Sequence, residues 1–242
     1  MSFNRKAQEE SVERAGVPQT ETIRLFGRIT DFENQPLPGA WVCLRNEKFE
    51  DLYEGQTDEH GCYELHVQPG LYYTLFACKD YKVNYLEYWA WNLPLFADYE
   101  LNARTDGLEV YSLSAFPVKR MTRQLMLYFR PMSLKRALAW EQETSLGSQD
   151  PSSIIDVGPK LDMADIEVYA NGVGCTVHEV NRVVEYGGAG NRIYAYLIHV
   201  SLPDSVDLYT YNRIDVELLD RETLERGEGT LFWKEERTVV GI

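Results

Sequence analysis

Short apolar–polar alternations, broken at close intervals by turn residues, fill residues 23–80 and constrain the fold more than any other feature. Ile23, Leu25 and Ile29 mark one face of the first alternating segment. An alternation of period two is typical of a β-strand with one buried face. The following residues, 31–39, contain two prolines and a glycine, which restrict or free φ and favour turns. This stretch therefore predicts short strands separated by turns.

A tight connection at residues 57–61 organises the strands that follow. Asp58 can accept hydrogen bonds from backbone amides two residues on, and Gly61 can adopt positive φ. Pro69 and Gly70 form a further turn signal. Around these turns the alternation predicts three more strands, at residues 41–45, 62–67 and 71–78.

Three motifs occur in order along this stretch: I-x-L-x-G-x-I-T-D, then P-L-P-G-A-x-V, then T-D-E-x-G-x-Y-x-L-x-V-x-P-G-x-Y. This order resembles the carboxypeptidase regulatory-like domain over residues 23–80, and at most as far as Val118. The resemblance implies a transthyretin-like (prealbumin-like) β-sandwich of about seven strands. It implies no activity, because the motifs mark turns and core tyrosines of an accessory module.

The rest of the chain also alternates, so the sequence predicts an all-β protein of two sandwiches. We expect a flexible arm at residues 1–21, the first sandwich at 22–120 with a last strand at 108–113, and a strand and linker region at 121–153. That region contains a strand at 124–129 and a helical turn or two at 134–143. A second antiparallel sandwich is expected at 154–242, with a hairpin at Asn171-Gly172. Tyr194, Tyr196, Ile198 and Val200 should share one strand face.

Charge excludes some classes of partner. The 242 residues carry a formal net charge of −14, which argues against nucleic-acid binding and against docking on an anionic membrane. The sequence contains no apolar run long enough for a transmembrane helix and no signal peptide, so we expect a cytoplasmic protein if Met1 is the native start. The oligomeric state is left open.

The four cysteines and four histidines show no metal-ligand spacing, so we expect neither a metal nor a cofactor. The cysteines are expected to be free, buried thiols. A Cys62–Cys78 disulfide between paired strands is conceivable and would require an oxidising compartment. Two histidines could still meet across strands.

An aromatic-rich segment at residues 81–101 is the best candidate for a binding site, because a loop of this length in a compact domain is often functional. The residues predicted to bind a ligand are Tyr81, Tyr85, Tyr88, Trp89 and Trp91. Sugar rings pack on such aromatic side chains, so a carbohydrate is the leading ligand class. The alternatives are that these aromatics seal a core between the domains or form a protein interface.

No catalytic residue can be assigned. The chain lacks G-x-S-x-G, a P-loop and H-E-x-x-H, and its carboxylates are too many for a pair to be chosen. The transthyretin-like hydroxyisourate hydrolases end in Y-R-G-S, whereas this chain ends in T-V-V-G-I. The sequence therefore favours a non-catalytic binding protein, with a structural or assembly module as the alternative and a hydrolase third.

Overall fold

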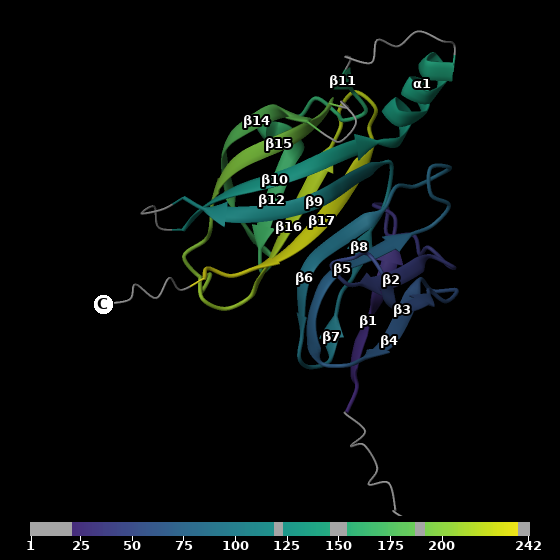
Figure 1. Ribbon diagram of the computed structural model, residues 1–242, viewed down its shortest axis with the longest axis vertical. Coiled ribbons are helices and arrows are strands. Elements are labelled where there is room, and N and C mark those ends of the chain that lie inside the picture. Colours follow the sequence, from purple (N-terminus) through teal and green to yellow (C-terminus); the bar gives the residue numbers. More distant parts are fainter. Residues whose placement is uncertain (1–20, 119–122, 146–153, 187–191, 237–242) are drawn as a thin grey trace, which may run out of the picture.

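A computed structural model describes residues 21–118, 123–145, 154–186 and 192–236. These residues form an all-β protein built on one long sheet that runs through two sandwiches (Figure 1). In spatial order its eight strands are β13 (Val173–Gly174), β12 (Ile166–Ala170), β16 (Asn212–Leu219), β17 (Arg226–Trp233), β6 (Tyr88–Leu95), β5 (Gly70–Cys78), β2 (Trp41–Arg45) and β3 (Asp51–Gln56).

Two smaller sheets pack on this long sheet. The N-terminal sheet covers the β6–β3 half and contains β4 (Cys62–Val67), β1 (Ile23–Thr30), β7 (Tyr99–Glu100) and β8 (Ala103–Arg104). The C-terminal sheet covers the β12–β17 half and contains β14 (Thr176–Tyr186), β15 (Arg192–Ser201), β10 (Gln124–Ser133), β9 (Leu108–Pro117) and β11 (Ile154–Ile155). The helix α1 (Leu134–Ser145) follows β10, and a 3₁₀ turn, η1 (Met163–Asp165), precedes β12.

The two smaller sheets lie on opposite faces of the long sheet. On β2, Val42 and Leu44 point into the N-terminal core with Leu25 and Ile29 of β1. On β16, the residues Ile214, Val216 and Leu218 point into the C-terminal core with the β10 and β15 side chains. Each smaller sheet covers one half of the long sheet on one face only. A cleft therefore opens on each face at the inner corner, where the edge of a smaller sheet meets the other half of the long sheet.

The predicted turn at residues 57–61 is confirmed. The Asp58 carboxylate accepts hydrogen bonds from the amides of His60 (2.9 Å) and Cys62 (2.8 Å), and the bond from Cys62 is the main cause that lowers the pKa of Asp58. Gly61 has φ of 74°, and a Cβ there would lie 2.6 Å from the Ile29 carbonyl oxygen. A side chain is therefore excluded at this position on two grounds.

The Asn171-Gly172 hairpin is also confirmed, with both residues at positive φ and β13 returning along β12. The strand expected around Tyr194 to Val200 and the strand expected at 124–129 exist as β15 and β10, and α1 follows where a helical turn was expected. Of the four residues predicted to share one face of this strand, Tyr196, Ile198 and Val200 are buried. Tyr194 is half-buried, and the Arg182 guanidinium lies over its ring.

Two expectations need correction. The strand at 108–113 does not close the first sandwich, because β9 runs to Pro117 and pairs with β10 in the C-terminal sheet. The aromatic segment is not a loop, because β6 forms the seam of the long sheet, antiparallel to β5 and parallel to β17. The predicted domain boundary at residue 120 and all but the last residue of the predicted arm at 1–21 lie outside the described residues.

Candidate functional site

The five aromatic residues predicted to bind a ligand do not form one surface. Tyr88, Trp89 and Trp91 lie on β6 and are buried, with exposed fractions of 1%, 4% and 5%. Tyr81 is exposed and Tyr85 is half-buried, and both lie in the turn before β6. The structure therefore does not bring these five side chains together on one open face.

The three buried aromatics tie the sandwiches together. The Trp89 and Trp91 rings stack at 5.4 Å, and both lie edge-on to Tyr111 of β9. Tyr88 points to the opposite face, where its hydroxyl donates to Thr230 Oγ1 of β17 at 2.8 Å. These contacts make β6 a structural strand at the junction.

A break in the strand alternation next to these residues creates a different site. On β5, Tyr72 and Leu75 point into the same N-terminal core, and on β6 Ala90 and Leu93 do so. Each strand therefore gains one residue relative to strict alternation. Asn92 accommodates the change with φ of 59°, a conformation that favours Asn over most other residues.

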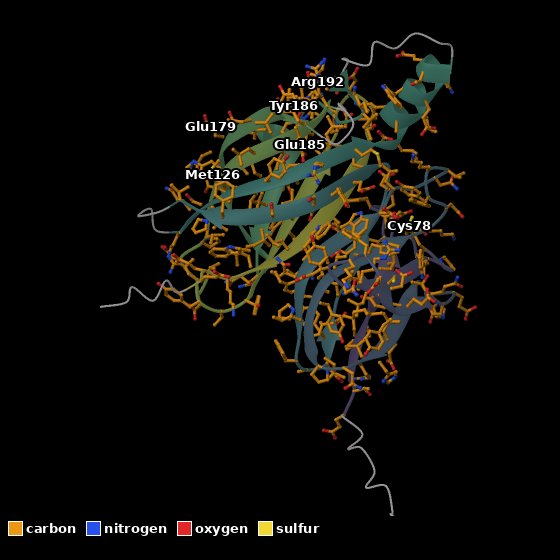
Figure 2. The ribbon with its side chains drawn as sticks, in the orientation of Figure 1. Cys78, Met126, Glu179, Glu185, Tyr186 and Arg192 are labelled. Carbon is orange, nitrogen blue, oxygen red and sulfur yellow. The ribbon has the colours of Figure 1, made fainter. Side chains whose placement is uncertain are left out.

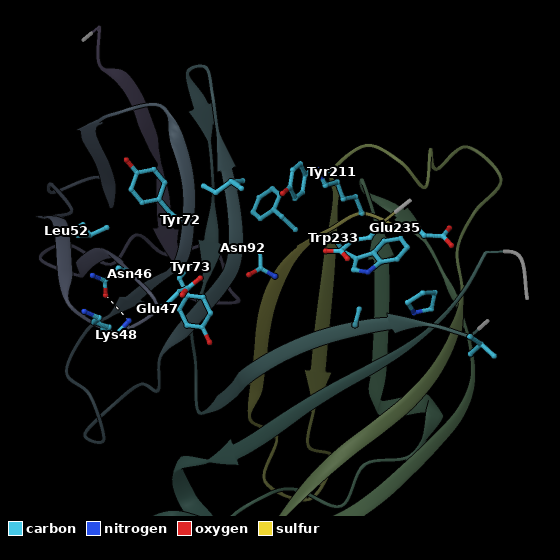
Figure 3. Close-up of a pocket in the computed structure, with 17 residues that line it drawn as sticks. Asn46, Glu47, Lys48, Leu52, Tyr72, Tyr73, Asn92, Tyr211, Trp233 and Glu235 are labelled. Atoms are coloured by element: carbon cyan, nitrogen blue, oxygen red, sulfur yellow. Dashed lines mark hydrogen bonds between the residues drawn. The ribbon is translucent and has the colours of Figure 1, made fainter. Parts of the chain in front are cut away.

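Because of this break, the Tyr73 and Asn92 side chains both point away from the N-terminal core, toward the same cleft. They lie opposite each other, between the register pairs Tyr72–Leu93 and Thr74–Trp91. Both line a cleft of about 1130 Å³ at the inner corner between the two sandwiches. Figure 3 shows them on the N-terminal side of this cleft, with Trp233 and Tyr211 on the C-terminal side.

The inter-sandwich cleft combines aromatic rings with polar groups. Tyr73 and Tyr211 are half-buried, and Asn92 is exposed. The rim carries charges of both signs, with Glu47 and Lys48 on the N-terminal side and Lys234 and Glu235 on the other. Lys234 Nζ lies 4.4 Å from the centre of the Tyr211 ring, within cation–π range. Flat rings beside neutral amides suit a polar organic ligand.

The second cleft, on the opposite face of the long sheet, has about 1000 Å³ and is lined by charges that pair with one another. Arg104 of β8 binds Glu228 of β17 through its side chain (2.8 and 2.5 Å) and its amide (2.6 Å), and also contacts Glu217 at 2.6 Å. Burial raises the pKa of Glu228 to about 7, which Arg104 opposes. This network links the sandwiches, and the Arg104 guanidinium is already engaged by both glutamates.

The described residues contain no group of three or more His, Cys, Asp or Glu side chains placed to hold a metal ion. His178 and His199 do meet across strands, with ring centres 5.2 Å apart, and bind Ser201 and Gln124 instead. The four cysteines are free as expected, but only Cys43 and Cys78 are buried, whereas Cys175 is half-buried and Cys62 is exposed. None of the helices in the described ranges has the length and apolar character needed to span a membrane.

No protein-family model matches the chain, and no curated protein matches it. Among solved structures, a Bacteroides uniformis protein to which carbohydrate binding is ascribed is 12% identical with a TM-score of 0.31, over 89% of this chain and 100% of that chain. The major pilin subunit of Bacillus cereus is 10% identical with a TM-score of 0.28, over 88% and 69%. A DUF3823 family protein from Bacteroides ovatus is 7% identical with a TM-score of 0.27, over 88% and 100%. At these values the similarity carries no argument about function.

Proposed function

We propose that the protein is a non-catalytic binding protein that holds a carbohydrate in the inter-sandwich cleft. The observation that carries this proposal is the paired display of Tyr73 and Asn92 on the cleft floor. A sugar ring can lay its C–H face on Tyr73 while the Asn92 amide, which both donates and accepts, binds its hydroxyl groups.

The backbone at Asn92 supports this proposal. Positive φ costs a non-glycine residue free energy, although less for asparagine than for most residues, and such residues cluster at functional sites. An exposed side chain in the seam strand gains no packing that would offset this cost. The positive φ and the exposed side chain of Asn92 therefore support a role for this side chain in binding.

The alternative is a structural or assembly module. It is favoured by the burial of Trp89 and Trp91 against Tyr111, since these rings seal one sandwich onto the other. Under this alternative the cleft is a by-product of two smaller sheets packing on opposite faces of one long sheet.

Calorimetric titration with a panel of neutral and acidic oligosaccharides tests the proposal. For a saccharide that binds, we expect Tyr73→Ala to weaken affinity by at least about tenfold, equivalent to about 1.4 kcal/mol. The matched control is Tyr186→Ala, which removes a 76% exposed tyrosine from β14, on the C-terminal sheet (Figure 2). Equal affinities for both variants, or no binding across the panel by the folded protein, would contradict the proposal.

A further inference from the structure

Two carboxyl groups lie where β9 meets β6. Glu109 is the second residue of β9 and is only 4% exposed, and Glu87 directly precedes β6. The Trp89 indole N–H donates to Glu109 Oε1 at 3.1 Å. Within the described residues the other oxygen, Oε2, has no hydrogen-bond partner. The Glu87 backbone amide also lowers the pKa of Glu109, but less than the Trp89 indole does. A buried carboxyl with so few donors is tolerated when neutral and becomes costly when ionised.

This carboxyl pair belongs to the contact that joins the sandwiches. Just ahead of it, the Leu86 amide donates to the Asp106 carbonyl at 2.9 Å, which ties the turn before β6 to the start of β9. Trp89 and Trp91 then pack on Tyr111. Trp91 in turn meets Tyr73 at 5.6 Å, so the junction is continuous with the inter-sandwich cleft.

The cations that face the pair are engaged elsewhere. Arg45 of β2 binds Asp51 at 2.6 Å, and Lys82 of the preceding turn binds Glu141 of α1 at 3.2 Å. Arg130 of β10 faces Tyr111 and binds Glu185. Neither Glu87 nor Glu109 forms an ion pair among the described residues.

The other titratable neighbours stay neutral through the physiological range or are already charged. Burial raises the pKa of Cys78 (β5, labelled in Figure 2) to about 12 and raises the pKa values of Tyr81 and Tyr111. Asp80 adds a further negative charge to this surrounding. Burial first, and repulsion from Glu87 second, raise the pKa of Glu109 to about 8, and burial also raises the pKa of Glu87. Glu109 is therefore the group in this surrounding whose charge changes between neutral and mildly alkaline solution.

We propose that Glu87 and Glu109 form a pH-responsive lock at the junction between the sandwiches. While Glu109 is protonated, β9 and β6 pack through the Trp89–Trp91–Tyr111 contact. When both carboxyls are ionised, their repulsion and the cost of burying an unpaired charge loosen this contact and admit water. The lock does not depend on the proposed ligand, because the measured quantity is the accessibility of the tryptophans at the junction.

Acrylamide quenching of tryptophan fluorescence from pH 6 to pH 10 tests this lock, with circular dichroism to confirm that the strands persist. In the native protein we expect quenching to rise by about twofold with a midpoint near pH 8, as the packed indoles become accessible. Glu109→Gln keeps the shape of the neutral carboxyl and should hold quenching at its low value throughout. Glu179→Gln, which changes an exposed glutamate of β14, is the control and should behave like the native protein.

Glu87→Gln gives a second, independent result. Without the repulsion from Glu87, the pKa of Glu109 falls, so the rise in quenching should begin at lower pH and be smaller in amplitude. A purely structural role for Glu87 would leave the midpoint unchanged. The proposal is overturned if quenching of the native protein is flat from pH 6 to pH 10. It is also overturned if Glu87→Gln leaves the midpoint in place, or if a folded Glu109→Gln variant retains the pH-dependent rise.

Discussion

Replacing Glu109 by glutamine should make the protein more stable, and increasingly so as the pH rises. Burial and the nearby Glu87 raise the pKa of Glu109 from its ordinary value of 4.5 to about 8. The folded protein therefore keeps a proton that the unfolded chain releases. For such a group the contribution to stability is greatest at low pH and is lost as pH rises from the unfolded to the folded pKa.

The magnitude follows from the two pKa values. One pKa unit corresponds to about 1.4 kcal/mol, so the shift penalises the folded native protein by roughly 1–2 kcal/mol at pH 5.5 and roughly 4–5 kcal/mol at pH 8.5. Glutamine does not titrate and avoids this penalty. The difference in free energy of unfolding between Glu109→Gln and the native protein should therefore grow by about 3 kcal/mol between these pH values.

Urea unfolding at pH 5.5 and pH 8.5, followed by circular dichroism, measures this difference. Comparing variant with native protein at each pH cancels the contributions of other titrating groups such as Glu228. Glu179→Gln, on the exposed edge strand, should change stability by less than about 0.5 kcal/mol at both pH values. A variant–native difference that stays constant with pH would refute the inference that Glu109 is protonated in the folded protein.

Three further predictions concern the junction and the long sheet. Gly227→Ala should lower the free energy of unfolding, measured in urea, by about 1–3 kcal/mol, because its Cβ would lie 2.3 Å from the Leu108 carbonyl oxygen. The control Gly174→Ala, whose Cβ would have no atom within 4 Å, should leave stability unchanged. Equal effects of the two substitutions would count against the close crossing of β9 over β17. Arg104→Met should lower the free energy of unfolding by about 3 kcal/mol near pH 8, because it leaves the Glu228 carboxylate buried without its partner. The loss should be smaller near pH 5.5, where Glu228 can take up a proton, and a loss independent of pH would argue against this pairing. Trp91→Ala should cost about 3–5 kcal/mol as a core truncation, and a loss below about 1 kcal/mol would show that the side chain is not packed as described.

The sequence predicted the strands well wherever one face of a strand is buried. In β4, β10 and β16, buried residues alternate clearly with more exposed ones, so period-two patterning is present in the sequence itself. The turns at residues 57–61 and 171–172 were equally accessible, because each depends on a few residues with specific backbone preferences. The resemblance to the carboxypeptidase regulatory-like domain stays a prediction.

The seam strand could not be predicted in the same way. Both faces of β6 are buried at Tyr88–Trp91, so this run has no alternation and reads as an aromatic loop. Its parallel partner β17 lies some 140 residues away in the chain, and local patterns do not encode such pairings. The strand at 108–113 was assigned to the wrong sandwich for the same reason. Its alternation predicted a strand, but not that this strand pairs with β10.

The cleft was missed because it depends on a break in two strands at once. Nothing in the composition of residues 70–95 marks Tyr73 rather than Tyr72 as the residue that turns outward. Asn92 was the available signal, because asparagine within a strand is unusual and tolerates positive φ. Sequence reasoning therefore selected the buried aromatics of this region rather than Tyr73 and Asn92.

The most direct test of the binding proposal is to map a bound oligosaccharide by NMR, using a saccharide identified by calorimetry. We predict that the resonances perturbed most are those of the Tyr73 ring, the Asn92 side-chain amide and the Trp233 indole, while those of Tyr186 on β14 stay unchanged. Perturbations confined to residues outside the inter-sandwich cleft would contradict the account.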